Sequence, residues 1–200
     1  MITSKKMRSQ KGFTLTEIAI VLGIMGLILG AIWTAASAVY SNRRSEEAQT
    51  AVIQAVQSLR VLYSTQAQFE APGDMNEELS KAGAIPKNLV LYKNTGEFDG
   101  TSGPFPNGKF NVTATDTTTF AITMSLVPRE NCINIIPIIA GNSRDPGLLE
   151  VVATASNSPA ISSVVCNEPH PMTAPVSVTQ ATNNHCTADM NQVTFCFSLK

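Results

Sequence analysis

Residues 12–40 read GFTLTEIAIVLGIMGLILGAIWTAASAVY, and Glu17 is the only charged side chain in this stretch. As an α-helix, residues 13–40 would be about 42 Å long at 1.5 Å per residue, and a bilayer core needs only about 20 apolar residues. A carboxylate inside such a span costs roughly 2.5–3.5 kcal/mol on insertion, so Glu17 is predicted to have a function. We therefore expect one hydrophobic, membrane-spanning helix over residues 13–40.

The segment before this stretch, MITSKKMRSQKG, is short and basic. Its four cationic side chains outnumber the pair that follows the stretch, Arg43 and Arg44, which predicts a cytoplasmic N-terminus. An ordinary secretory signal has its small-residue cleavage site after the apolar region, whereas here the candidate site, between Gly12 and Phe13, lies before it. Residues 1–12 would be removed as a leader, and the hydrophobic segment would stay on the mature protein.

A basic leader that ends in Gly12, followed by Phe13 and by Glu17 at the fifth mature position, resembles the type IV prepilins. The resemblance covers residues 1–50. It implies cleavage between Gly12 and Phe13 by a dedicated membrane prepilin peptidase, N-methylation of Phe13, and polymerisation into a filament. In the filament, Glu17 would pair with the new α-amino group of Phe13 on a neighbouring copy, which offsets the cost of burying both charges and fixes the register.

The chemistry of the chain changes after Tyr40, but its helical periodicity continues. Apolar residues recur at spacings of mostly three and four, at Ala48, Val52, Ala55, Val56, Leu59 and Leu62. This pattern predicts an amphipathic helix over residues 41–70 that covers a core, ending before the turn-forming Ala71-Pro72-Gly73-Asp74. Residues 41–200 are long enough for one compact domain, and we treat them as a globular head.

Period-two alternation predicts an antiparallel sheet with one buried and one open face. The alternating runs begin at Phe110, Phe120 and Val193, and residues 150–154 (EVVAT) are expected to add a strand. Smaller predicted elements are a helix over 75–84, an extended segment over 89–92, a loop over 94–108, a helix or buried turn over 132–140, and an exposed irregular segment over 156–182. The fold class is therefore α+β, and it matches the pilin α/β-roll in outline.

Four cysteines, Cys132, Cys166, Cys186 and Cys196, lie in the last seventy residues. An even number on the exported side of a membrane anchor predicts two disulfides, and neither a C-x-x-C pair nor suitably spaced histidine indicates zinc. Cys132 and Cys186 resemble the two ends of the disulfide-bounded region of pilins, which leaves Cys166–Cys196 as a second bond. The nested pairing, Cys132–Cys196 with Cys166–Cys186, stays open.

Other functional classes have little support in the sequence. Removing the leader takes four of the fourteen basic side chains and none of the fifteen acidic ones, and the resulting charge of −5 is not typical of nucleic-acid binding. No nucleophile elbow or paired-histidine motif indicates an enzyme, and no cofactor or metal is predicted. Glu97 and Asp99 beside Gly100 are too few carboxylates for a calcium loop.

The resemblance thus implies a non-enzymatic pilus subunit that serves adhesion, aggregation or conjugation. Its expected partners are further copies of itself, the peptidase, the bilayer, an inner-membrane assembly machine with its ATPase, and a host or recipient-cell surface. Its expected location is the inner membrane and then the extracellular pilus. The large cysteine-bounded region resembles type IVb pilins, whereas Phe13 and the short leader resemble type IVa. A minor pilin or a type II secretion pseudopilin is the alternative.

Overall fold

The computed structural model describes residues 14–66, 68–162, 166, 172 and 174–200. It divides into two compact units, residues 1–40 and 41–200. Helix α1 (Leu15–Leu62) has a part in each unit, and the division falls where the sequence changes from apolar to amphipathic.

The predicted helix end at residue 70 is wrong, because α1 ends at Leu62. The Ser64 hydroxyl donates a hydrogen bond of 2.8 Å to the Val61 carbonyl as the chain turns. The Phe69 N–H then donates to the Thr117 carbonyl at 2.7 Å, and the Phe69 ring packs edge-on against Phe120. Burial of Phe69 in this position requires the chain to leave the helical path early.

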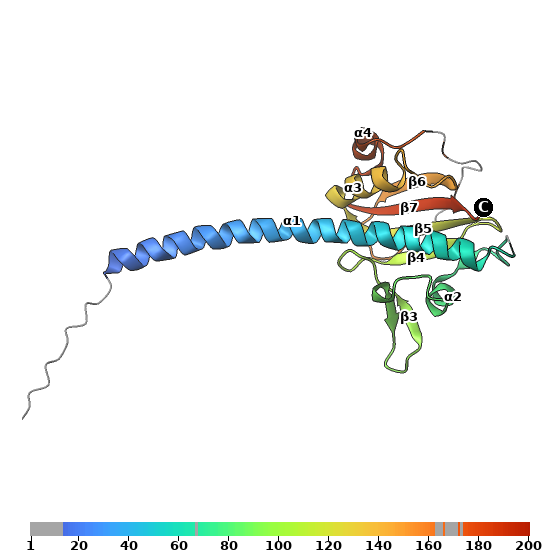
Figure 1. Ribbon diagram of the computed structural model, residues 1–200, viewed down its shortest axis with the longest axis horizontal. Coiled ribbons are helices and arrows are strands. Elements are labelled where there is room, and N and C mark those ends of the chain that lie inside the picture. The colour runs from blue at the N-terminus through green and yellow to red at the C-terminus, as the bar shows by residue number, and fades with distance from the viewer. Residues whose placement is uncertain (1–13, 67, 163–165, 167–171, 173) are drawn as a thin grey trace, which may run out of the picture. The chain divides into compact units, whose positions relative to one another are not determined.

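Five strands in the described chain form one antiparallel sheet in the order β1–β4–β5–β7–β6 (Figure 1). They are β1 (Gly73–Asp74), β4 (Phe110–Ala114), β5 (Thr119–Pro128), β6 (Leu148–Ala155) and β7 (Met190–Ser198). The alternating runs are confirmed as β4, β5 and β7, and the EVVAT segment as part of β6. The last strand in sequence, β7, lies between β5 and β6, so the C-terminal residues complete the sheet.

The remaining elements lie in the connections. They are α2 (Asn76–Lys81), a 3₁₀-helix (Lys87–Leu89), β2 (Val90–Tyr92), β3 (Phe98–Thr101), α3 (Arg129–Ile139), α4 (Val178–Gln180) and a π-helix (Ala181–His185). Strands β2 and β3 form a separate two-stranded sheet. The helix predicted over 75–84 and the extended segment over 89–92 are confirmed, whereas β3 replaces part of the loop predicted over 94–108.

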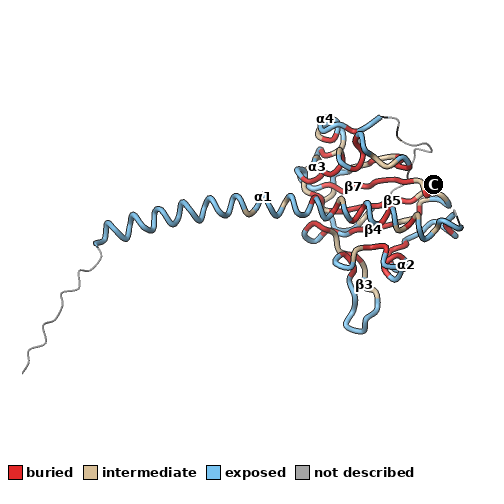
Figure 2. Tube along the Cα trace, viewed as in Figure 1, coloured by how far each residue is buried: buried red, intermediate tan, exposed pale blue. Residues whose placement is uncertain are grey.

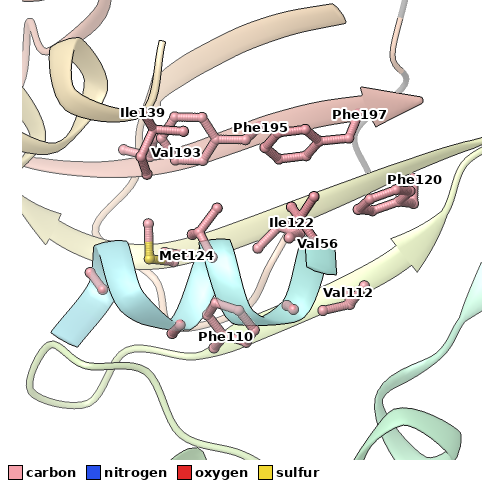
Figure 3. Close-up of a cluster of buried hydrophobic side chains, with 14 of the residues drawn as sticks. Val56, Phe110, Val112, Phe120, Ile122, Met124, Ile139, Val193, Phe195 and Phe197 are labelled. Carbon is pink, nitrogen blue, oxygen red and sulfur yellow. The ribbon is translucent and has the colours of Figure 1, made fainter. Parts of the chain in front are cut away.

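The core of the head lies between α1 and one face of the sheet, which we call the inner face. The α1 residues that are buried here follow the predicted spacing: Ser45, Ala48, Ala51, Val52, Ala55, Val56 and Leu59. Leu62 is 44% exposed and does not belong to this stripe. Phe110, Ile122 and Phe195 reach the stripe from three neighbouring strands (Figure 3). Both apolar surfaces are thereby removed from water, at about 25 cal/mol per Å² of apolar area.

The prediction of one open sheet face is wrong for the central strands. On the outer face, away from the core, Thr123, Ser125 and Thr194 are also buried. The tube is accordingly red along most of β5 and β7 (Figure 2). Ala121, Leu149 and Cys196 form a second small cluster there, and Cys166 packs against it. The chain after β6 covers this face: the Ser125 hydroxyl donates to the Pro159 carbonyl at 3.0 Å. An alternating pattern shows which side chains share a face, but it does not show what covers that face.

An ion pair joins the end of α1 to the chain before β6. Arg60 donates two hydrogen bonds to the Asp145 carboxylate, at 2.6 and 2.7 Å, and a third to the Ser198 carbonyl at 3.1 Å. Burial acts to raise the pKa of Asp145, but hydrogen bonds from Arg60 and the Gly147 N–H, together with the charge of Arg60, lower it below the ordinary 3.8. The folded state therefore favours the ionised carboxylate.

We expect the Arg60–Asp145 ion pair to make the free energy of unfolding depend on pH in the acidic range. A lowered pKa stabilises the fold fully above the unfolded value of 3.8, and this contribution is lost as the pH falls through the folded-state pKa. We expect the free energy of unfolding of the wild-type head to fall more steeply than that of Asp145→Asn between about pH 4 and pH 2. Urea unfolding at several pH values measures this. Asp189→Asn, at an exposed carboxylate, is the control and should retain the wild-type slope.

Candidate functional site

The first half of α1 has an uncharged, exposed surface after its first turn. Large apolar side chains point in all directions around it and are roughly 50–90% exposed, among them Leu15 (88%), Leu27 (78%) and Trp33 (75%). By length and composition, α1 is the one helix in the described chain that is able to cross a membrane; its most apolar window has a mean hydropathy of 2.4. A helix that is apolar all round needs a bilayer or other protein around it. We call residues 14–40 the stem.

Glu17 lies in the first turn of α1, where Thr14 binds its carboxylate. The backbone N–H and the hydroxyl of Thr14 both donate to Oε2 of Glu17 at 2.9 Å, and the Glu17 N–H donates to the Thr14 hydroxyl at 3.3 Å. This reciprocal arrangement is a capping box, which satisfies backbone donors that a helix N-terminus otherwise leaves free. The Thr14 bonds use only one of the two carboxylate oxygens.

Sequence reasoning did not single out Thr14. The signal was nevertheless present, because Thr14-Leu-Thr-Glu17 has the S/T-x-x-E spacing of a capping box directly before an apolar run. The predicted cleavage pair, Gly12 and Phe13, lies outside the described residues. The structure therefore places Glu17 and its local partner, and the roles of Gly12 and Phe13 stay predictions.

Disulfides join Cys132 to Cys186 and Cys166 to Cys196, with Cα–Cα distances of 5.9 and 5.8 Å. This is the pairing that the resemblance favoured, and the nested alternative does not form. Cys132 lies in α3, so the segment 132–140, left open between helix and turn, is helical up to Ile139. Cys196 lies in the central strand β7.

The connection from β6 to β7 passes from one face of the sheet to the other. On the outer face, the Ser162 N–H donates to the side-chain carbonyl of Gln192 at 2.9 Å, and the Gln192 amide donates back to the Ser162 carbonyl at 3.3 Å. At the sheet edge, the Met172 N–H donates to the Leu148 carbonyl of β6 at 2.9 Å. The chain then reaches the inner side, where Ala181 and Cys186 are buried in the core.

The connection therefore wraps around β6, and each disulfide fastens it on one face. Its bond from Met172 occupies the Leu148 carbonyl, one of the backbone groups at the edge of the sheet that could otherwise pair with another strand. The prediction of an irregular segment over 156–182 is confirmed for residues 156–162. It is wrong from Val178 onward, where α4 begins. Residues 163–165, 167–171 and 173 of this segment lie outside the described residues.

A buried asparagine fastens α3 to the first turns of α1 in the head. The side-chain amide of Asn131 donates to the Ser41 carbonyl at 3.0 Å and to the hydroxyls of Ser41 and Ser45 at 3.1 and 2.8 Å. Asn131 is 4% exposed, so these bonds replace those it would make to water. No spacing rule links residues 90 positions apart, and sequence reasoning missed this contact.

The described residues contain no group of three or more metal-ligating side chains in one place. Glu97 lies at the β2–β3 turn, where it accepts a hydrogen bond of 3.3 Å from the Thr95 hydroxyl and lies 3.9 Å from the Lys93 ammonium group. The described chain thus has three features that bear on function: an apolar stem, the Glu17 carboxylate in the capping box at its start, and a head held by two disulfides.

Comparison with known proteins gives two family matches. The model for the prokaryotic N-terminal methylation motif matches residues 7–33, which include Gly12, Phe13 and Glu17. The model named PilS N terminal matches residues 42–198, nearly the whole head. No curated protein matches the chain. The second match covers more than half of the sequence and the first gives the prepilin motif, so the chain belongs to the PilS N-terminal family and is a type IV pilin.

Proposed function

We propose that this protein is the structural subunit of a type IV pilus. The prepilin peptidase cuts it after Gly12, Phe13 is methylated, and further copies polymerise through residues 13–40. The observation that carries the proposal is the stem: a helix exposed all round, uncharged after Glu17, and continuous with the spine of a folded head.

The physical reason for polymerisation is the apolar area of the stem. Burying one large aliphatic or aromatic side chain contributes about 1.5–3 kcal/mol relative to leaving it in water. A bilayer provides this burial before assembly, and neighbouring stems provide it in a filament. The exchange of lipid for protein is then nearly even in apolar contacts, so the direction of the process is set by the assembly machine and its ATPase.

Glu17 supplies the specificity that apolar packing lacks. Apolar surfaces slide past one another with little preference for a register, whereas a carboxylate and an α-amino group prefer one distance. The capping box fixes where the carboxylate lies on α1, and Thr14 uses only Oε2. We propose that the α-amino group of Phe13 of a neighbouring copy pairs with this carboxylate.

The head supports an exported location, because its four cysteines are paired and disulfides persist in oxidising compartments. We propose that the head faces outward on the filament and serves adhesion, aggregation or conjugation, with a host or recipient cell as the partner. The large cysteine-bounded region favours the type IVb subgroup.

Mass spectrometry of non-reduced protein sheared from native cells tests this function. The expected species begins at Phe13, carries one extra methyl group, lacks free thiols and is the most abundant protein in the fibres. A cleaved chain present in few copies per fibre would identify a minor pilin, and one confined to a secretion apparatus a pseudopilin. An uncut chain in cells that bear pili would overturn the proposal.

A further inference from the structure

The cover over the outer face of the sheet consists, in the described chain, of residues 156–162 and Cys166. It is thin: Asn157, Ser158 and Ala160 are exposed, and Ile161 is half-buried. Among the described residues, the Ser156 N–H at the start of the cover donates to the Met190 carbonyl of β7 at 3.1 Å, and the other contacts that hold the cover are made by side chains of the sheet. They are the bond from Ser125 to the Pro159 carbonyl, the two bonds between Gln192 and Ser162, and the Cys166–Cys196 disulfide.

The sheet beneath the cover is complete without it. Strand β7 pairs with β5 on one side and with β6 on the other, and the large apolar side chains of β5 and β7 point to the inner face. The outer face carries mostly small or hydroxyl side chains, such as Ala121, Thr123 and Thr194, and the two threonines hydrogen-bond to each other at 3.0 Å. Separation of the cover therefore leaves the core between α1 and the sheet intact.

The two disulfides differ in how an external thiol reaches them. Cys132 and Cys186 are both 0% exposed and belong to the main core, so access to their sulfurs requires α3 and the π-helix to open. Cys196 is also 0% exposed, but Cys166 is partly exposed and belongs to the cover. Local opening of a weakly held segment occurs far more often than opening of a core.

We propose that Cys166–Cys196 is a thiol-exchange site of the folded protein, and that its co-reactant is an external dithiol such as that of a thiol–disulfide oxidoreductase. A thiolate of the dithiol attacks Sγ of Cys166, the bond to Cys196 breaks, and Cys196 leaves as a thiolate that takes up a proton. The second thiol of the dithiol then displaces Cys166, which is also protonated. The dithiol gives up two electrons and becomes a disulfide, while Cys132–Cys186 stays oxidised.

The product is a folded head whose cover is held only by hydrogen bonds. Its release uncovers a small apolar surface formed by Ala121 and Leu149 next to Cys196. This inference does not depend on pilus assembly, because it concerns the head alone.

The test uses the full chain in detergent solution and dithiothreitol as the dithiol. Samples taken over time are alkylated, and peptide mapping assigns each modified cysteine. Because attack requires only the cover to open, we expect Cys166 and Cys196 to become alkylated at least roughly tenfold faster than Cys132 and Cys186, with an unchanged circular dichroism spectrum. Equal rates for the four cysteines, or faster modification of Cys132 and Cys186, would overturn the proposal.

Gln192→Ala provides a second, independent test. It removes both hydrogen bonds to Ser162 and should accelerate alkylation of Cys166 and Cys196 severalfold, with no change at Cys132 and Cys186. Gln57→Ala, at an exposed glutamine of α1, is the matched control and should leave all four rates unchanged. If Gln192→Ala accelerates alkylation of all four cysteines equally, the exchange results from general destabilisation of the head. The cover then does not open independently of the core, and the proposal is overturned.

Discussion

Glu17→Gln is expected to leave the chain cleaved and inserted in the membrane but to abolish filament formation. Glutamine at this position still accepts the Thr14 hydrogen bonds, since capping boxes use Glu or Gln, and α1 keeps its first turn. The substitution removes only the charge proposed to pair with a neighbour's α-amino group. An unpaired buried charge costs roughly 3–5 kcal/mol, which lowers the equilibrium constant for adding each subunit more than about a hundredfold.

The measurement compares protein in sheared filaments with total cellular protein by immunoblot. Glu46→Gln, at an exposed carboxylate of α1 beyond the stem, is the matched control and should assemble normally. Thr14→Val isolates the capping contribution of about 1 kcal/mol and should reduce the yield without abolishing it. Wild-type filament yield from Glu17→Gln would exclude charge pairing, and loss of filaments in Thr14→Val alone would assign Glu17 a purely capping role.

Gly12→Ala is expected to block processing and, with it, assembly. The resemblance to prepilins implies a peptidase that requires glycine before the cut, so the variant should keep residues 1–12 and their four positive charges. The Phe13 nitrogen then stays in a peptide bond and carries no charge for Glu17 to pair with. Filament loss is therefore expected to match that of Glu17→Gln, although the two chains differ in mass.

Gel mobility and the intact mass of the membrane-bound chain measure this outcome. Gln10→Ala, in the same leader but away from the cut, should be processed and assembled as wild type. Mature-sized Gly12→Ala protein in unchanged amount would contradict prepilin-type processing at this bond. Uncleaved Gly12→Ala protein in normal filaments would instead show that assembly does not need a free α-amino group, and would argue against the role proposed for Glu17.

Much of the fold was predictable because it depends on local periodicity. The α1 stripe from Ala48 to Leu59 and the alternating residues of β4, β5 and β7 each follow the repeat of their own secondary structure. Such patterns predict which side chains share a face. They do not predict contacts between distant segments, and the Asn131 bonds to α1 and the cover over β5 and β7 were therefore missed.

The wrong boundaries have a related cause. Gly73 and Asp74 have the composition of a turn, but they pair with Ala114 and Thr113 of β4 and extend the sheet. Phe98–Thr101 lies among turn-forming residues and still forms β3, because β2 offers it a partner. In both places strand pairing overrides local preference. In the stem, the sequence singled out Glu17 because a charge in an apolar span is unusual, and its role stays a prediction. The capping contact with Thr14 was missed because it depends on the spacing between two ordinary residues.

The two disulfides also determine how far the head can be stretched. A free chain from Cys132 to Cys196 would extend to about 220 Å at roughly 3.4 Å per residue. The shortest covalent path instead crosses the Cys132–Cys186 disulfide, with its Cα–Cα distance of 5.9 Å, and follows ten residues to Cys196, about 40 Å in all. This path does not pass through Cys166. Under tension, the head is therefore expected to keep about 180 Å of its contour length folded, whether or not the Cys166–Cys196 disulfide holds the cover.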